Sequence, residues 1–351
     1  MPVPDAQTPG VAPGVARWLL LCAGLVAAMV VIGGITRLTG SGLSIVEWQP
    51  VYGVLPPLSA ADWQALFEAY QATPQYRAIN VGMTVAEFRG IFWWEYLHRL
   101  LGRLIGVAFL VPFLWFLWRG ALGRRQIRSY ALIFALGGAQ GLLGWTMVKS
   151  GLIDRPWVSP LSLAAHLGLA MLIYAALLWQ AWMLLRPLSE TLPDFRWPRS
   201  RSAAKGAFAL VAATMLTGAL MAGSHAGYAF PTFPLMEGQM LPKDYFGYEP
   251  WFFAPFEHLA TINFNHRWLA ILTLGVVVAA WTESRWLALV PRARRIANGM
   301  ALVGLAQVAL GIATLVLGVP VWLAALHQAS ALALLSLALA LVYELRPPAS
   351  A

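Results

Sequence analysis

Eight long apolar stretches constrain the fold of this 351-residue chain more than any other feature. A helix needs about 20 mostly apolar residues to cross the hydrocarbon core of a bilayer, and each stretch is long enough. Only 11% of the residues are charged, against about 25% in ordinary soluble domains, which excludes most soluble enzymes. We therefore predict eight spans, near residues 17–36, 91–118, 129–149, 160–185, 204–224, 258–282, 296–318 and 321–344.

The net charge of +9 comes from basic residues that cluster in alternate loops. Arg and Lys are concentrated in loops 119–128, 186–205 and 283–295, whereas loops 150–158 and 225–257 contain one each. Because cytoplasmic loops of membrane proteins are rich in these residues, the first three loops and both termini are predicted to be cytoplasmic. The pattern indicates membrane topology and no nucleic-acid partner.

A repeat of motifs divides the chain into two halves. A His-Arg pair occurs in the second and sixth predicted spans, an Ala-Gln pair in the third and seventh, and a histidine in the fourth and eighth. The motifs are His98-Arg99 and His266-Arg267, Ala139-Gln140 and Ala306-Gln307, and His166 and His327. Since each half has four spans, both halves enter the membrane in the same direction, as in a parallel tandem repeat.

These features predict an all-α polytopic membrane protein. Its eight transmembrane helices would form two tandem four-helix bundles in a parallel pseudo-repeat, and the first bundle would carry a long outer loop at 37–90. The predicted segments are a cytoplasmic tail 1–16, the first bundle 17–185, a cytoplasmic linker 186–203, the second bundle 204–344 and a cytoplasmic tail 345–351.

The four repeated histidines are candidate axial ligands of haem iron. Each lies roughly 9–12 Å below the predicted outer boundary, at 1.5 Å of helix rise per residue. Two imidazoles at one depth on different helices can approach a flat macrocycle from opposite faces. The alternatives are histidines hydrogen-bonded within the bundle, or a zinc or non-haem iron site, which usually adds a carboxylate. His225 and His258 lie at loop edges, which favours interfacial roles for them.

Glu95 is an acid close to one of these histidines. It precedes His98 by three residues, so the two side chains share one face of a helix. An acid near the hydrocarbon is costly and usually functional. Two roles stay open: an ion pair with Arg99, or proton transfer and charge stabilisation at a substrate. The second half has Ile262 or Asn263 in the corresponding region.

Three arginines near the histidines also have two open roles. Arg99, Arg103 and Arg267 could reach an interface or pair with acids. Alternatively, their planar guanidinium groups could bind the propionates of haem. The spacing does not decide between these roles.

The outer segment 37–89 is the longest connection and is rich in Trp, Tyr and Pro. The stretches 59–62 and 84–87 each match the residue pattern of a helix N-terminus. We expect short amphipathic helices on the outer surface, or a plain ordered loop. In either form the segment could cover a ligand that enters from the bilayer.

Several motifs together resemble the haem A synthase family, and the resemblance extends over almost the whole chain. They are residues 33–39 (GGITRLT), 41–44 (SGLS), 95–99 (EYLHR), 141–145 (GLLGW), 147–152 (MVKSGL), 158–160 (VSP) before His166, 232–236 (TFPLM), His266-Arg267 and His327-Gln328. Cys22 is the only cysteine, so no internal disulfide can form. One branch of the family carries a cysteine pair in its outer loops, so this chain resembles the mitochondrial and proteobacterial branch.

The resemblance implies an oxidoreductase that converts the C8 methyl group of haem O to a formyl group, giving haem A for cytochrome oxidase. It implies that His266 and His327 hold a haem b cofactor, that His98 and His166 bind the substrate haem, and that Glu95 lies beside the reacting edge.

The implied location is a bacterial inner membrane, and the implied partners are an electron donor, haem O synthase and cytochrome oxidase assembly factors. Two alternatives remain: a di-haem b-type electron-transfer protein, and a transporter with structural histidines.

Overall fold

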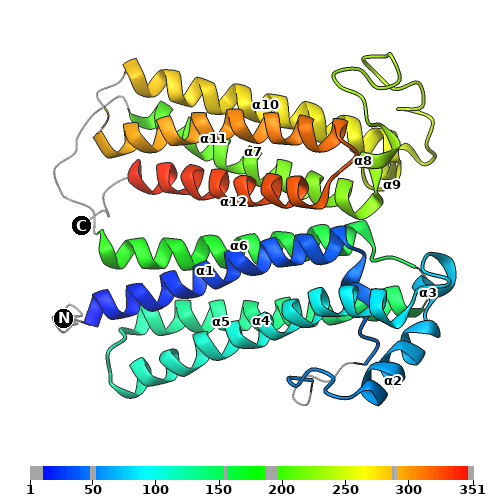
Figure 1. The fold of residues 1–351 in the computed structure, drawn as a ribbon. Helices are drawn as coiled ribbons and strands as arrows, with labels where there is room; N and C mark the ends of the chain where they lie inside the picture. Colours follow the sequence, from blue (N-terminus) through cyan, green and yellow to red (C-terminus); the bar gives the residue numbers. More distant parts are fainter. Residues whose placement is uncertain are drawn as a thin grey trace. The chain divides into compact units, whose positions relative to one another are not determined.

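The computed structural model describes residues 11–47, 53–153, 156–186, 197–286, 289 and 291–346. Its regular secondary structure there is helical, apart from one isolated β-bridge between Met236 and Gln239 (Figure 1). The predicted N-terminal and C-terminal tails and the predicted linker fall largely outside these residues.

Eight helices are long and apolar enough to cross a membrane. They are α1 (Val11–Leu38), α4 (Val85–Trp118), α5 (Arg124–Ile153), α6 (Pro160–Leu185), α7 (Trp197–Ser224), α10 (Leu259–Trp286), α11 (Pro291–Val316) and α12 (Val321–Glu344). Short helices lie between them: η1 (Ser41–Leu43), α2 (Ala60–Gln71), α3 (Pro74–Ala78), α8 (Ala226–Ala229), η2 (Trp251–Phe253) and α9 (Ala254–Glu257). The prediction of an all-α polytopic membrane protein is confirmed.

The start of α4 differs from its prediction. The helix begins at Val85 instead of near residue 91, because Thr84 and Glu87 form a capping box around its first turn. The expectation of a separate short helix at this pattern was therefore wrong, since the helix that starts there continues to Trp118. The equivalent pattern at Ser59 and Asp62 does begin a short helix, α2, as predicted.

Residue contacts divide the chain into two compact units. The first unit comprises residues 1–162 and 169–187, and the second comprises residues 163–168 and 188–351. Helix α6 contributes to both, since its turn at 163–168 groups with the second unit. The parallel pseudo-repeat stays a prediction at the level of the fold.

The second unit contains a four-helix bundle. Helix α7 packs against α10 and α12, and α11 packs against α10 and α12 (Figure 1). Small residues permit close approach: a Cβ placed on Gly304 of α11 would lie 3.2 Å from a Val277 methyl group of α10. The Thr214 and Thr273 hydroxyls, 2.8 Å apart, join α7 to α10.

In the first unit, α1 packs along α4. The Trp18 indole donates a hydrogen bond of 2.9 Å to the carbonyl of Ala108, and the Thr36 hydroxyl lies 3.3 Å from the carbonyl of Trp94. These two contacts tie α1 to α4 at widely separated points along both helices.

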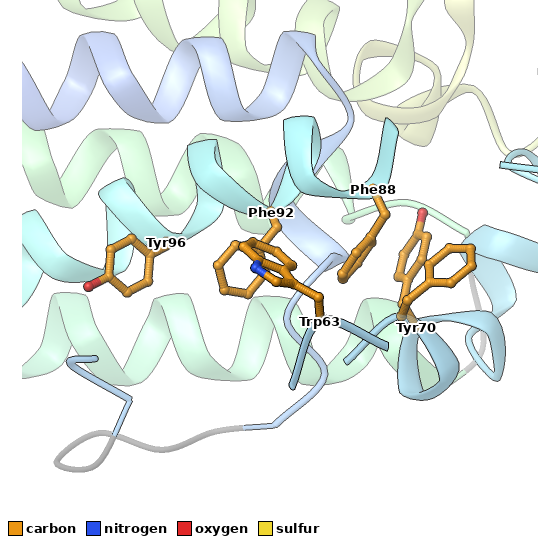
Figure 2. Close-up of a cluster of buried hydrophobic side chains, with 6 residues drawn as sticks. Trp63, Tyr70, Phe88, Phe92 and Tyr96 are labelled. Carbon is orange, nitrogen blue, oxygen red and sulfur yellow. The ribbon is translucent and has the colours of Figure 1, made fainter. Parts of the chain in front are cut away.

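An aromatic cluster holds α2 against the first turns of α4 (Figure 2). Its buried members are Trp63, Phe67, Tyr70, Phe88, Phe92 and Tyr96. The ring of Tyr70 stacks on Phe88 with centroids 5.3 Å apart, and its hydroxyl donates to Gln75. Gln75 in turn donates to the carbonyl of Gly40, which follows α1. The cluster therefore fixes the segment between α1 and α4 as a packed structure.

Replacing Phe88 with alanine should loosen this segment. Phe88 is fully buried, and removing a buried phenylalanine ring costs about 3–5 kcal/mol. We expect faster amide hydrogen exchange in α2 of the solubilised protein. Leu55→Ala is the matched control, because Leu55 is 75% exposed and its truncation should leave the exchange unchanged. Equal exchange in α2 for Phe88→Ala and wild type would contradict the packing described here.

Candidate functional site

Two histidines of the second unit each lie against a glycine of a neighbouring helix. His266 is on α10, and a Cβ placed on Gly218 of α7 would lie 3.1 Å from its Cε1 atom. His327 is on α12, and a Cβ on Gly311 of α11 would lie 2.9 Å from its Cε1 atom. Both rings are half-buried. At both glycines a side chain would displace the imidazole.

Hydrogen bonding leaves one nitrogen of His266 ready to bind a metal. The Thr217 hydroxyl lies 3.0 Å from Nδ1 of His266 and donates its proton to the carbonyl of Thr214 at 2.9 Å. Thr217 therefore accepts from Nδ1–H, which leaves the lone pair on Nε2 free. Metal-binding histidines are commonly oriented in this way by a second hydrogen bond.

Gln307 has a related position beside His327. Its Oε1 accepts a short hydrogen bond from Ser330, which directs its amide nitrogen towards Nε2 of His327 at 3.5 Å. Nδ1 of His327 is buried and has no hydrogen-bond partner among the described residues. The ring is thus held mainly by packing.

This donor set fits haem iron better than zinc. No group of three or more His, Cys, Asp or Glu side chains able to hold a metal occurs in the described part of the chain. A tetrahedral zinc site needs three or four such ligands. Two imidazoles on separate helices, each beside a glycine, match the axial ligation of a haem. His266 and His327 could hold such a group.

His98 of the first unit has the same kind of glycine neighbour. A Cβ on Gly33 of α1 would lie 3.0 Å from its Nε2 atom. His166 is half-buried on α6, in the turn that groups with the second unit. The pairing of His98 with His166 stays a prediction.

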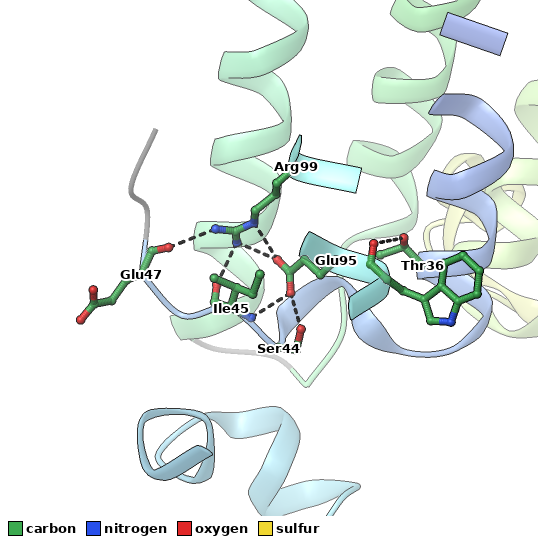
Figure 3. Close-up of polar contacts among 7 residues, drawn as sticks. Thr36, Ser44, Ile45, Glu47, Glu95 and Arg99 are labelled. Atoms are coloured by element: carbon green, nitrogen blue, oxygen red, sulfur yellow. Dashed lines mark hydrogen bonds and ion pairs between the residues drawn. The ribbon is translucent and has the colours of Figure 1, made fainter. Parts of the chain in front are cut away.

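Glu95 lies one helical turn before His98 and is only 2% exposed. Its Oε2 atom accepts hydrogen bonds from the Ser44 hydroxyl at 2.7 Å and from the Ile45 amide at 2.8 Å. Its Oε1 atom accepts from Nε of Arg99 at 3.0 Å and from Nη2 at 2.7 Å (Figure 3). The ion pair with Arg99, one of the two roles considered for Glu95, is present. The carboxylate is therefore held rigidly by four donors.

Arg99 and Arg267 also donate to backbone carbonyls in a matching way. Arg99 bonds to the carbonyls of Ile45 at 2.8 Å and Glu47 at 3.0 Å, after η1 (Figure 3). Arg267 bonds to the carbonyls of Phe230 at 2.7 Å and Thr232 at 2.6 Å, after α8. In each unit the arginine next to the histidine fixes the segment that follows a short helix.

Arg103, His225 and His258 complete the set of residues considered from the sequence. Arg103 is half-buried on α4, one turn after Arg99. Propionate contacts of the three arginines stay predictions. His225 has a positive φ of 61° directly before α8, and His258 lies between α9 and α10, where it bonds to Thr261 at 2.9 Å.

Sequence reasoning missed the side chains that hold the candidate ligands. Thr217 and Ser330 were not expected at the site, and Gln307 was noticed only as part of the repeat. Ser44 was noticed only within a family motif. None of the four carries a signal of its own in the sequence, because each acts through a contact between distant segments.

Comparison with known proteins identifies the family. Residues 16–339 match the COX15-CtaA model, described as cytochrome oxidase assembly protein. The chain is 48% identical over 339 residues to a protein named "Heme A synthase" from Nitrosospira multiformis, covering 95% of this chain and 93% of the relative. Two further relatives have the same name. The protein from Rhodospirillum centenum is 48% identical, and the match covers 99% of this chain and 92% of the relative. The protein from Paramagnetospirillum magneticum is 47% identical, and the match covers 94% of this chain and 93% of the relative. The chain therefore belongs to the COX15-CtaA family of cytochrome oxidase assembly proteins.

Proposed function

We propose that the chain is a haem A synthase, an enzyme of haem A biosynthesis that oxidises the C8 methyl group of haem O to a formyl group. The names of relatives that align with 94% or more of this chain support this function. The observation that carries the assignment of roles is Glu95, a buried carboxylate one turn from His98. The second unit has Asn263 four residues before Arg267, where the first has Glu95 four residues before Arg99.

In this proposal His266 and His327 hold haem b as a permanent cofactor. When bound, haem b supplies an iron that accepts and donates single electrons. Thr217 fixes the tautomer and orientation of His266, and Gly218 and Gly311 leave room for the two rings.

His98 and His166 bind the substrate haem O, and Glu95 acts at its reacting methyl group. Conversion of a methyl to a formyl group takes up the oxygen of one water and releases four electrons and four protons, so it needs an external electron acceptor. In this proposal water traps the developing positive charge. Glu95 stabilises that charge or accepts a proton. Ser44, Ile45 and Arg99 keep the carboxylate in one orientation, which limits the reorganisation needed during the reaction.

The protein would function in the inner membrane of a bacterium, with both termini in the cytoplasm. Its proposed partners are an electron donor, haem O synthase and cytochrome oxidase assembly factors. The alternative, a di-haem b-type electron-transfer protein, would bind two haem B groups and form no haem A.

Changing Glu95 should separate catalysis from cofactor binding. We expect Glu95→Gln and Glu95→Ala to keep the haem b spectrum and to lower conversion of haem O about 10²- to 10⁴-fold, the range of general acid–base catalysis. The measurement is haem extraction and chromatography from protein made in cells that also synthesise haem O. Glu68→Gln, an exposed acid on α2, is the control and should retain turnover. Full conversion by Glu95→Ala would refute the role of this carboxylate.

The histidines should divide by haem type. We expect His266→Ala to lose the reduced-minus-oxidised signal of haem b, because an axial ligand is removed. His98→Ala should keep that signal and lose bound haem O or haem A. Spectra and extracted haems from the same preparations test both variants. Loss of haem b from His98→Ala alone would reverse the assignment of the two sites.

Adding a methyl group at Gly311 should weaken haem b binding. The new Cβ would lie 2.9 Å from His327, and overpacking of this kind costs about 1–3 kcal/mol, or roughly 5- to 150-fold in affinity. Gly299→Ala on the same helix is the control, since its Cβ would make an ordinary contact of 3.7 Å with Leu337. Haem b content per chain after purification is the measurement. Equal content in the two variants would show that the glycine contact does not shape the site.

A further inference from the structure

The two units differ in the charge beside the first histidine of each. Four residues before Arg99 stands Glu95, and four residues before Arg267 stands Asn263. Both arginines make the same pair of hydrogen bonds to carbonyls of their own unit. Among the residues that the structure describes, Arg99 also has a carboxylate partner, at 2.7 Å, and Arg267 has none.

Asn263 does not take over the role of Glu95 in the second unit. It is fully buried, and its Nδ2 donates to the carbonyl of Ala226 at 2.8 Å. Its Oδ1 has no partner among the described residues, and neither has Nε of Arg267. The Asn side chain is one methylene shorter than Glu and is directed to Ala226, so it does not bond the guanidinium.

Arg267 is therefore a buried cation without an ion pair in the part of the chain that the structure describes. It is 8% exposed and directly follows His266 in the sequence. A charge in such a low-dielectric environment acts more strongly than it would in water. Ferric haem carries one more positive charge than ferrous haem, so a fixed cation nearby favours the ferrous state and raises the reduction potential.

We propose that Asn263 is a potential-setting residue: by leaving Arg267 without a carboxylate partner from the protein, it gives the haem held by His266 a higher reduction potential than a carboxylate at this position would allow. The inference rests on the proposed haem b site. Its consequence is that the permanent haem is a better electron acceptor than it would be with a carboxylate at position 263.

A charge-only comparison at position 263 tests the proposal. Asn263→Glu and Asn263→Gln introduce side chains of equal length, and only Glu can neutralise Arg267. The measurement is a spectroelectrochemical titration of haem b in the purified, haem-loaded protein. We expect Asn263→Glu to shift the midpoint to lower potential and Asn263→Gln to remain at the wild-type value. Equal shifts in both variants, or no shift in Asn263→Glu, would overturn the proposal.

A second pair of variants covers the case in which Asn263→Glu fails to fold. Arg267→Gln removes the charge, and Arg267→Lys keeps it while also losing the bonds to Phe230 and Thr232. We expect a lower midpoint for Arg267→Gln than for Arg267→Lys, and equal midpoints would overturn the proposal. Wild-type protein that contains no haem B would refute the proposed function itself. A bound haem b whose midpoint potential does not respond to these substitutions would refute only the role of Asn263.

Discussion

The bonds from Arg99 and Arg267 to backbone carbonyls connect the fold to the candidate site. Within or near a bilayer, every polar backbone group at a break between helices needs a partner. After η1 and after α8 the chain leaves helical geometry, and the arginine beside the nearby histidine supplies the missing donors. The same helical turn therefore carries a candidate ligand and fixes the segment next to it.

Glycines also shape the candidate site, because they leave space for the histidine rings. The imidazole rings of His98, His266 and His327 each occupy space that a Cβ on the facing glycine would enter. Helix packing and ligand geometry consequently depend on the same positions. A glycine that looks like an ordinary small residue for helix packing also determines where a histidine ring can lie.

The sequence was sufficient to predict eight membrane-spanning helices, but not the contacts between them, and its candidate ligands stay predictions. Helices α6 and α12 begin and end where they were predicted. Pro160 is the first residue of α6, Pro320 directly precedes α12, and the apolar run defines the length of each helix. The predicted start of α4 was too late, because the first turns of this helix precede the apolar run that defined the predicted span. Their aromatic residues are buried against α2. The backbone carbonyls that Arg99 bonds are not predictable from the sequence, because a carbonyl acceptor leaves no trace in the residue pattern.

Glu95 and Asn263 show how one position can separate two similar frameworks. In the first unit the carboxylate neutralises Arg99 and is itself fixed by Ser44 and Ile45, so the turn before His98 holds an anchored acid with no net charge in the pair. In the second unit the amide bonds Ala226, and the positive charge of Arg267 persists beside His266. A carboxylate can accept a proton and can stabilise a developing positive charge. A guanidinium group without a carboxylate partner can do neither. The residue four positions before the arginine therefore sets the charge of this turn: an ion pair in the first unit, and in the second an arginine with no carboxylate partner among the described residues.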